Sequence, residues 1–133
     1  MDELIRDTKI LHPELSYQII GACFAVYKEI GPGHKEEYYQ RALAAWFKQK
    51  GIRFREQVYE RLEFSGERIG SYRLDFLVEE KIVVEIKALE RFRFENYRQV
   101  KTYLSQTGID LGLLIRFSDD GVRFQRILRP FDP

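Results

Sequence analysis

The sequence predicts an α+β fold with an α/β-type core, in which helices flank a mixed β-sheet in the order ααβββαββ. Three stretches place apolar residues at the spacing of amphipathic helices. Five other stretches are rich in β-branched and aromatic residues and are separated by turn-forming residues. A chain of 133 residues is long enough for one domain with its own core, so a single domain is expected over residues 1–133.

Two helices are expected before the first strand. The first spans residues 14–30 and ends at Gly31-Pro32-Gly33, because glycine suits a left-handed cap and proline cannot continue a helix. The second spans about residues 34–50, with acidic residues in its first turn and lysines in its last turn, as the helix dipole favours. Residues 1–12 are expected to form a loose leader.

Five strands and a third helix follow. The expected strands span residues 52–64, 69–78, 82–89, 111–117 and 122–128, with turns at 65–68, 79–81 and 119–121 and a helix at 94–107. The third strand is apolar on both faces, so it should lie in the centre of the sheet. This strand, the helix and the fourth strand form a β-α-β unit, and strands joined in this way are parallel.

Three charged side chains interrupt the apolar hairpin between residues 72 and 89. Asp75 lies in its first strand, whereas Glu85 and Lys87 lie two residues apart in its second strand and therefore point to the same face. Charges are rarely placed in buried strands without a partner or a metal, because their desolvation is costly. Two carboxylates can bind a hard cation such as Mg²⁺ or Mn²⁺, and the lysine can hold phosphate or orient water. The pattern therefore indicates a metal-dependent site for phosphodiester hydrolysis.

Polar residues on the helices could join this site. Glu36 lies in the first turn of the second helix, where it could bind the metal or one of its waters. Gln99 and Tyr103 lie one turn apart on the third helix and could hydrogen-bond phosphate or the lysine. Basic residues near the start of that helix would form a rim for a nucleic-acid backbone, namely Arg91, Arg93, Arg98 and Lys101.

The order of these motifs resembles the PD-(D/E)XK nuclease superfamily. Asp75 followed by Glu85-Ile86-Lys87 is similar to the hairpin that presents an Asp and a Glu-x-Lys to a metal in that superfamily. Gln99-Val-Lys-Thr-Tyr103 resembles the Q-x-x-x-Y motif of its helicase-associated exonuclease branch. Residues 33–39 fit the signature of the GxxExxY protein family, which is placed in the same superfamily. The resemblance covers about residues 14–128.

The resemblance implies a restriction-endonuclease-like fold and a metal-dependent nuclease, with DNA favoured over RNA as the partner. The implied metal ligands are Asp75, Glu85, the Ile86 carbonyl and Glu36, and the implied catalytic residues are Asp75, Glu85, Lys87, Glu36, Gln99 and Tyr103. The implied cofactor is Mg²⁺ or Mn²⁺. One departure from the motif is Leu74, which precedes Asp75 where the superfamily often has proline.

Simpler explanations remain open for individual residues. Asp75 and Lys87 could form a cross-strand ion pair, and Glu36 could only stabilise the start of its helix. The chain could also be a catalytically inactive nucleic-acid-binding or protein-interaction module on the same fold. A homodimer is left open, because a one-domain nuclease that cuts duplex often needs two active sites.

Composition indicates a folded protein and bears on its partners and its cellular location. The hydrophobic content of 44% and the charged content of 32% are typical of a folded domain. A net charge of +1 gives no global field that would attract nucleic acid or a membrane surface. One cysteine and the lack of an apolar stretch of transmembrane length favour a cytoplasmic protein without a membrane partner.

Overall fold

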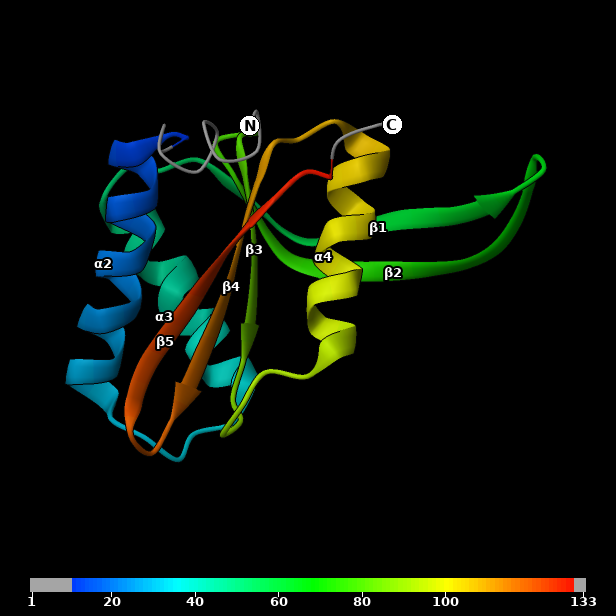
Figure 1. Ribbon diagram of the computed structural model, residues 1–133. Helices are drawn as coiled ribbons and strands as arrows, with labels where there is room; N and C mark the ends of the chain where they lie inside the picture. The colour runs from blue at the N-terminus through cyan, green and yellow to red at the C-terminus, as the bar shows by residue number, and fades with distance from the viewer. Residues whose placement is uncertain (1–10, 131–133) are drawn as a thin grey trace, which may run out of the picture.

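The structure, a computed structural model, describes residues 11–130 as one five-stranded sheet with helices on both faces (Figure 1). The elements are α2 (Pro13–Ile30), α3 (Glu36–Gln49), β1 (Phe54–Phe64), β2 (Glu67–Val78), β3 (Ile82–Lys87), α4 (Phe94–Thr107), β4 (Leu111–Ser118) and β5 (Gly121–Leu128). Their order and the mixed sheet confirm the α+β prediction. The leader expected at residues 1–12 lies almost entirely outside the described residues, and the extent of the domain beyond them stays a prediction.

The strands lie side by side in chain order, from β1 to β5. The pairs β1–β2, β2–β3 and β4–β5 are antiparallel, whereas β3 and β4 are parallel and are joined through α4. The expected β-α-β unit is therefore present. β3 is the central strand, and all its residues from Ile82 to Ile86 are buried, as its apolar pattern predicted.

Two apolar clusters fill the space between the layers. α2 and α3 cover one face of the sheet, where Phe76 and Ile86 are fully buried. α4 covers the other face, where Val100 and Leu104 pack on sheet residues such as Val83. Successive residues of β3 divide between the two clusters, because side chains alternate along a pleated strand. Among the helices that the structure describes, none combines the length and apolarity needed to cross a membrane.

The hairpin of β1 and β2 extends beyond the body of the domain (Figure 1). β2 pairs with β1 along most of its length, whereas it pairs with β3 only over residues 76–78. We call residues 58–74 the arm. Ser65 and Gly66 both have positive φ and form a two-residue turn at its tip, of the kind that matches the twist of a hairpin. The turn expected at residues 65–68 was therefore too long.

The alternation of side chains along β2 breaks beside Asp75. Phe76 packs on the side of α2 and α3, but Tyr72 and Leu74 pack on the side of α4, although strict alternation predicts one shared face for all three. Gln57, opposite this point on β1, has a φ of +53°, which indicates a local distortion. β2 thus rotates toward α4 as it leaves the sheet.

The third strand is shorter than expected. Its pairing with β4 ends at Lys87, opposite Arg116, and residues 88–93 lead across to α4. The expectation of a strand over residues 82–89 was too long, because β3 stops at Lys87 although β4 continues to Ser118 beside β5. Lys87 therefore lies at the very end of β3, beside an open edge.

Candidate functional site

The divergence of β2 from β3 creates the candidate site. Backbone pairing stops at Phe76, and the next two residues across the strands are Asp75 and Glu85. The Ile86 N–H donates to Oδ2 of Asp75 at 2.8 Å, and the Asp75 N–H donates to Oε1 of Glu85 at 3.2 Å. Each carboxylate therefore binds an amide that the opened sheet would otherwise leave buried and unpaired.

The two carboxylates are also buried, since Asp75 is 4% exposed and Glu85 is 3% exposed. Burial and, after it, the nearby Asp75 raise the pKa of Glu85 to about 9, although Lys87 opposes both effects. Nζ of Lys87 lies 3.6 Å from Oε2 of Glu85. One ammonium thus faces a pair of adjacent acidic groups, and their burial would be far less costly with a divalent cation bound.

The donor set can be tested against such a cation. Hard divalent ions prefer oxygen ligands, and two adjacent carboxylates that share a buried position provide them. Within residues 11–130, no group of three or more Asp, Glu, His or Cys side chains lies close enough to hold a metal ion. The carboxylates of Asp75 and Glu85 therefore fit the ion only together with other oxygens, such as the Ile86 carbonyl and water.

Glu36 approaches the same place from the start of α3. Burial raises the pKa of its carboxyl, while Lys87 lowers it and Asp75 raises it, so both charges act on Glu36. Since no three-carboxylate group forms among the described residues, Glu36 does not complete a metal site with Asp75 and Glu85. Of the two roles expected for Glu36, contact with the metal itself or with one of its waters, the second needs no third carboxylate at the metal and stays a prediction.

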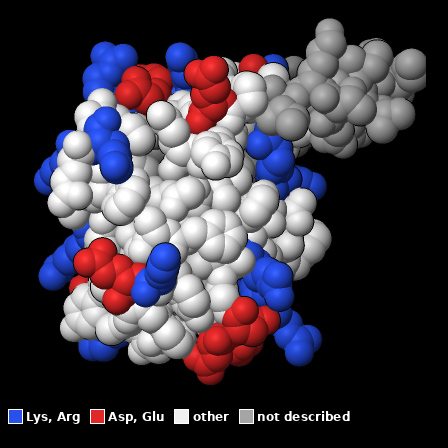
Figure 2. Space-filling view, turned by 90° about the vertical axis from the view of Figure 1, so that its left-hand side faces the viewer, with Lys and Arg blue, Asp and Glu red and all other residues white. Residues whose placement is uncertain are grey.

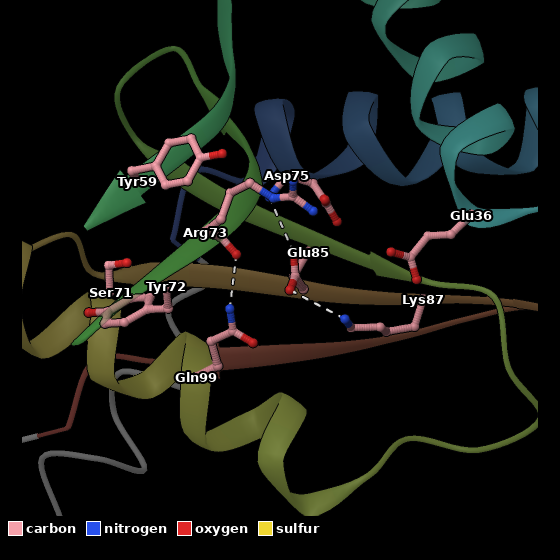
Figure 3. A pocket seen from close by; sticks show the side chains of 9 residues that line it. All are labelled: Glu36, Tyr59, Ser71, Tyr72, Arg73, Asp75, Glu85, Lys87 and Gln99. Atoms are coloured by element: carbon pink, nitrogen blue, oxygen red, sulfur yellow. Dashed lines mark hydrogen bonds and ion pairs between the residues drawn. The ribbon is translucent and has the colours of Figure 1, made fainter. Parts of the chain in front are cut away.

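An open pocket of about 320 Å³ surrounds these groups (Figure 3). Its lining residues are Glu36, Tyr59, Ser71, Tyr72, Arg73, Asp75, Glu85, Lys87 and Gln99. Five of the predicted site residues are thus brought together from α3, β2, β3 and α4, namely Glu36, Asp75, Glu85, Lys87 and Gln99. The pocket is wide enough for a nucleotide-sized group to reach the carboxylates.

The arm supplies a wall of the pocket that the sequence analysis missed. Ser71 and Arg73 precede Asp75 at two-residue spacing on β2, and Tyr59 lies opposite Arg73 on β1. Nε2 of Gln99 donates to the Arg73 carbonyl at 2.9 Å, so α4 holds β2 at this point. The spacing of Ser71 and Arg73 from Asp75 was a usable signal in the sequence, whereas the place of Tyr59 depends on the strand register.

Tyr103 and the expected basic rim lie away from the pocket lining. Tyr103 is buried in the apolar layer under α4, with its ring 6.3 Å from that of Tyr72 in an edge-on arrangement. Arg98 and Lys101 line a separate groove along α4, and the Arg98 guanidinium lies over the Phe94 ring. The other two rim residues, Arg91 and Arg93, are exposed on the segment before α4.

The turn before α3 explains how Glu36 is positioned. Oη of Tyr39 donates to the Gly31 carbonyl at 2.7 Å and accepts from the His34 N–H at 3.4 Å. The Tyr39 ring stacks on Phe117 with 4.2 Å between the centroids, which fixes the turn to β4. Gly33 has a φ of +86°, a conformation that favours glycine. Within residues 33–39, the tyrosine therefore anchors the turn and the glutamate faces the pocket.

Comparison with known proteins gives a family match. The model of the PD-(D/E)XK nuclease superfamily matches residues 13–127, a range that contains every predicted site residue. This match concerns the superfamily, so the narrower similarity to the GxxExxY family stays a prediction. No curated protein matches the chain significantly.

Solved structures share the fold. The crystal structure of SSO0001 has a TM-score of 0.55 and 20% identity, over 72% of this chain and 51% of that one. LHK-Exo, an alkaline exonuclease from Laribacter hongkongensis, has a TM-score of 0.51 and 19% identity, over 71% of this chain and 55% of that one. Its complex with dAMP also has a TM-score of 0.51 and 19% identity, over 71% and 54% of the chains. This chain spans about half the length of these proteins, and identities this low show the fold alone.

Proposed function

Since the chain belongs to the PD-(D/E)XK nuclease superfamily, we propose that it is a metal-dependent nuclease that hydrolyses phosphodiester bonds, with DNA favoured over RNA. The observation that carries the proposal is the buried pair of Asp75 and Glu85 beside Lys87 in an open pocket. Nucleases of this superfamily generally use divalent metal ions. Mg²⁺ or Mn²⁺ would be held by Asp75, Glu85 and the Ile86 carbonyl, with Glu36 contacting a bound water.

Each pocket residue has a role that its position supports. When bound, the cation supplies positive charge to the phosphate and lowers the pKa of a bound water. The Lys87 ammonium holds the attacking water or a phosphate oxygen beside Glu85. Arg73 and Gln99 bind other phosphate oxygens, because they line the pocket next to the carboxylates. The exposed Tyr59 ring offers a surface on which a base can stack.

Support for DNA as the substrate is indirect. One of the solved structures with the same fold is an alkaline exonuclease bound to dAMP, a deoxynucleotide. The pocket of this chain combines cations with an exposed aromatic ring, which suits a nucleotide of either type. The preference for DNA, the identity of the metal ion and the cytoplasmic location therefore all stay predictions.

A catalytically inactive nucleic-acid-binding or protein-interaction module is the competing function. The observation in its favour is that two acidic side chains, rather than three, gather at the candidate metal position within residues 11–130. Such a module would bind nucleic acid equally well in chelator. The two functions are therefore distinguished by the metal dependence of binding and cleavage.

The test is cleavage of labelled single- and double-stranded DNA and RNA with Mg²⁺, Mn²⁺ or chelator. Lys87→Ala should lower the metal-dependent rate by about 10²–10⁴-fold, the range for loss of a group that assists proton transfer. Lys81→Ala is the matched control, because Lys81 is an exposed lysine in the turn of the same hairpin. Full activity of Lys87→Ala would exclude the proposed role of that lysine, and metal-independent binding without cleavage would favour the inactive module.

A further inference from the structure

The outer face of α2 is apolar at positions where a surface helix is usually polar. Ile19, Cys23 and Val26 face the core, whereas Tyr17 and Phe24 are 79% and 48% exposed. Figure 2 looks onto the side of the molecule where α2 lies, and it shows a central region without charged residues, with Lys, Arg, Asp and Glu toward the margins. A continuous uncharged surface of this kind indicates contact with another molecule.

Five exposed residues lie in one line along this face, and we call them the α2 stripe: Glu14, Tyr17, Gly21, Phe24 and Lys28. They follow one another at alternating intervals of three and four residues. This spacing is typical of a helix that packs lengthwise against a second helix. The stripe is opposite the buried face of α2, so within residues 11–130 it is not part of the core.

The middle of the stripe is suited to a close helix crossing. A Cβ placed on Gly21 would meet no atom within 4 Å, so the surface is open there. The missing side chain lets another backbone approach closely. Beside Gly21, a groove of about 340 Å³ is lined in part by Tyr17, Trp46 and Ile52. The stripe and the groove together form one apolar surface on the side of α2 and α3.

The charges at the two ends of the stripe indicate which molecule covers it. Glu14 and Lys28 each lie seven residues from Gly21, on opposite sides. Within residues 11–130, neither takes part in an intramolecular ion pair. If a second α2 crosses antiparallel at Gly21, each Glu14 faces the Lys28 of the other copy. The surface is therefore complementary to itself, as a two-fold interface requires.

We propose that the chain forms a homodimer in which α2 packs antiparallel against α2 of a second copy, with the two-fold axis at Gly21. The stripe lies on the side of the sheet away from α4 (Figure 1). Ile86 of β3 packs toward α2 and α3, so its neighbours Glu85 and Lys87 face the side of α4, because side chains alternate along a strand. The dimer therefore leaves both pockets open to substrate. It also does not rest on the proposed nuclease function, so it can be tested without a cleavage assay.

The first test is the sedimentation behaviour of the full chain over a range of about 1–100 µM, where a reversible dimer of moderate affinity dissociates. Phe24→Lys places a charge in the centre of the interface and should raise the Kd by at least about tenfold. Glu29→Lys is the matched control on the same helix, because Glu29 is exposed but lies off the stripe. A wild-type protein that is monomeric at every concentration would overturn the proposal.

The second test concerns the antiparallel arrangement. Glu14→Lys alone and Lys28→Glu alone each create two repulsive pairs and should weaken self-association by roughly tenfold. An equimolar mixture of the two variants restores both attractive pairs and should dimerise like the wild type. Both positions are exposed, so circular dichroism should show unchanged folding. An unchanged Kd in both single variants would exclude this interface. A mixture of the two variants that does not regain wild-type dimerisation would also exclude it.

Discussion

The two ends of the β1–β2 hairpin have opposite surroundings. At the base, Phe54 and Phe76 lie within the sheet and pack against Phe47, with ring centroids 5.5–5.8 Å apart. In the arm, Phe64 and Ile69 are 69% and 63% exposed. One continuous pair of strands is therefore core at one end and a solvent-exposed ribbon at the other.

The candidate site lies where the base becomes the arm. When β2 leaves β3, two amides lose their partners in the ladder, and the carboxylates of Asp75 and Glu85 take their place. The same divergence opens the pocket beside the strands. The early end of the β2–β3 pairing therefore does two things. It positions the two acidic side chains, and it leaves space beside them for a substrate.

The largest difference in stability between the base and the arm should come from replacing one phenylalanine in each. Phe76→Ala removes a fully buried ring at the base and should lower the free energy of unfolding by about 3–5 kcal/mol. Phe64→Ala, its matched control in the arm, should change it by less than about 0.5 kcal/mol. Urea denaturation measures both values, and similar losses for the two variants would show that the arm is packed in solution.

A smaller loss of stability is expected at Asp75, at the junction where the base of the hairpin becomes the arm. Asp75→Ala leaves the buried Ile86 N–H without its acceptor and should cost about 1–3 kcal/mol of unfolding free energy. Asp75→Asn keeps an acceptor oxygen and should cost less. Denaturation in chelator separates this structural effect from metal binding. Equal stability of the two variants would mean that the carboxylate does not replace the missing ladder bond.

The third prediction concerns pH at the same junction. The folded protein holds a proton on Glu85 up to its pKa of about 9, whereas the unfolded chain releases it near the ordinary value of 4.5. The folded state binds more protons within this window, so the stability of metal-free protein should fall as pH rises through it. Glu85→Gln cannot ionise and should give a flatter profile of urea midpoints. Identical profiles would contradict the raised pKa.

The smallest effect on stability is expected where the arm contacts α4, and there the mobility of the arm should change while that of the base does not. Oη of Tyr72 donates to Oε1 of Gln106 at 2.6 Å, which fastens the arm to α4. Gln106→Ala removes an exposed hydrogen bond and should change overall stability by less than about 0.5 kcal/mol. Hydrogen exchange should nevertheless become faster in residues 58–74 and not in residues 76–78. Ser105→Ala is the neighbouring control, and equal exchange in both variants would show that the bond from Tyr72 to Gln106 does not hold the arm.

The sequence revealed those features that depend on local pattern. The order of the elements and the central position of β3 follow from the spacing of apolar residues. Asp75, Glu85 and Lys87 stood out because charge is rare in a buried strand. Gln99 lies on the predicted helix and lines the same pocket. In each of these cases the informative residues are close together in the chain.

Features that depend on a partner strand or on helix placement were missed. The end of β3 is the point where its pairing with β4 stops, and the place of Tyr59 follows from its register opposite Arg73. Tyr103 was expected to join Gln99, but one helical turn moves a residue by about 5 Å along the axis. That shift is enough to carry Tyr103 from the pocket edge into the apolar layer.

The hydrogen bond from Ile86 to Asp75 has an evolutionary consequence. Asp75 serves the fold as well as the proposed chemistry, so selection for a stable domain would retain it even in a lineage that had stopped cleaving nucleic acid. Selection for stability would not retain Lys87 in the same way, because its role is in the proposed chemistry rather than in pairing the hairpin backbone. Among descendants of this protein, replacement of the lysine with retention of the aspartate would therefore mark the loss of enzymatic activity.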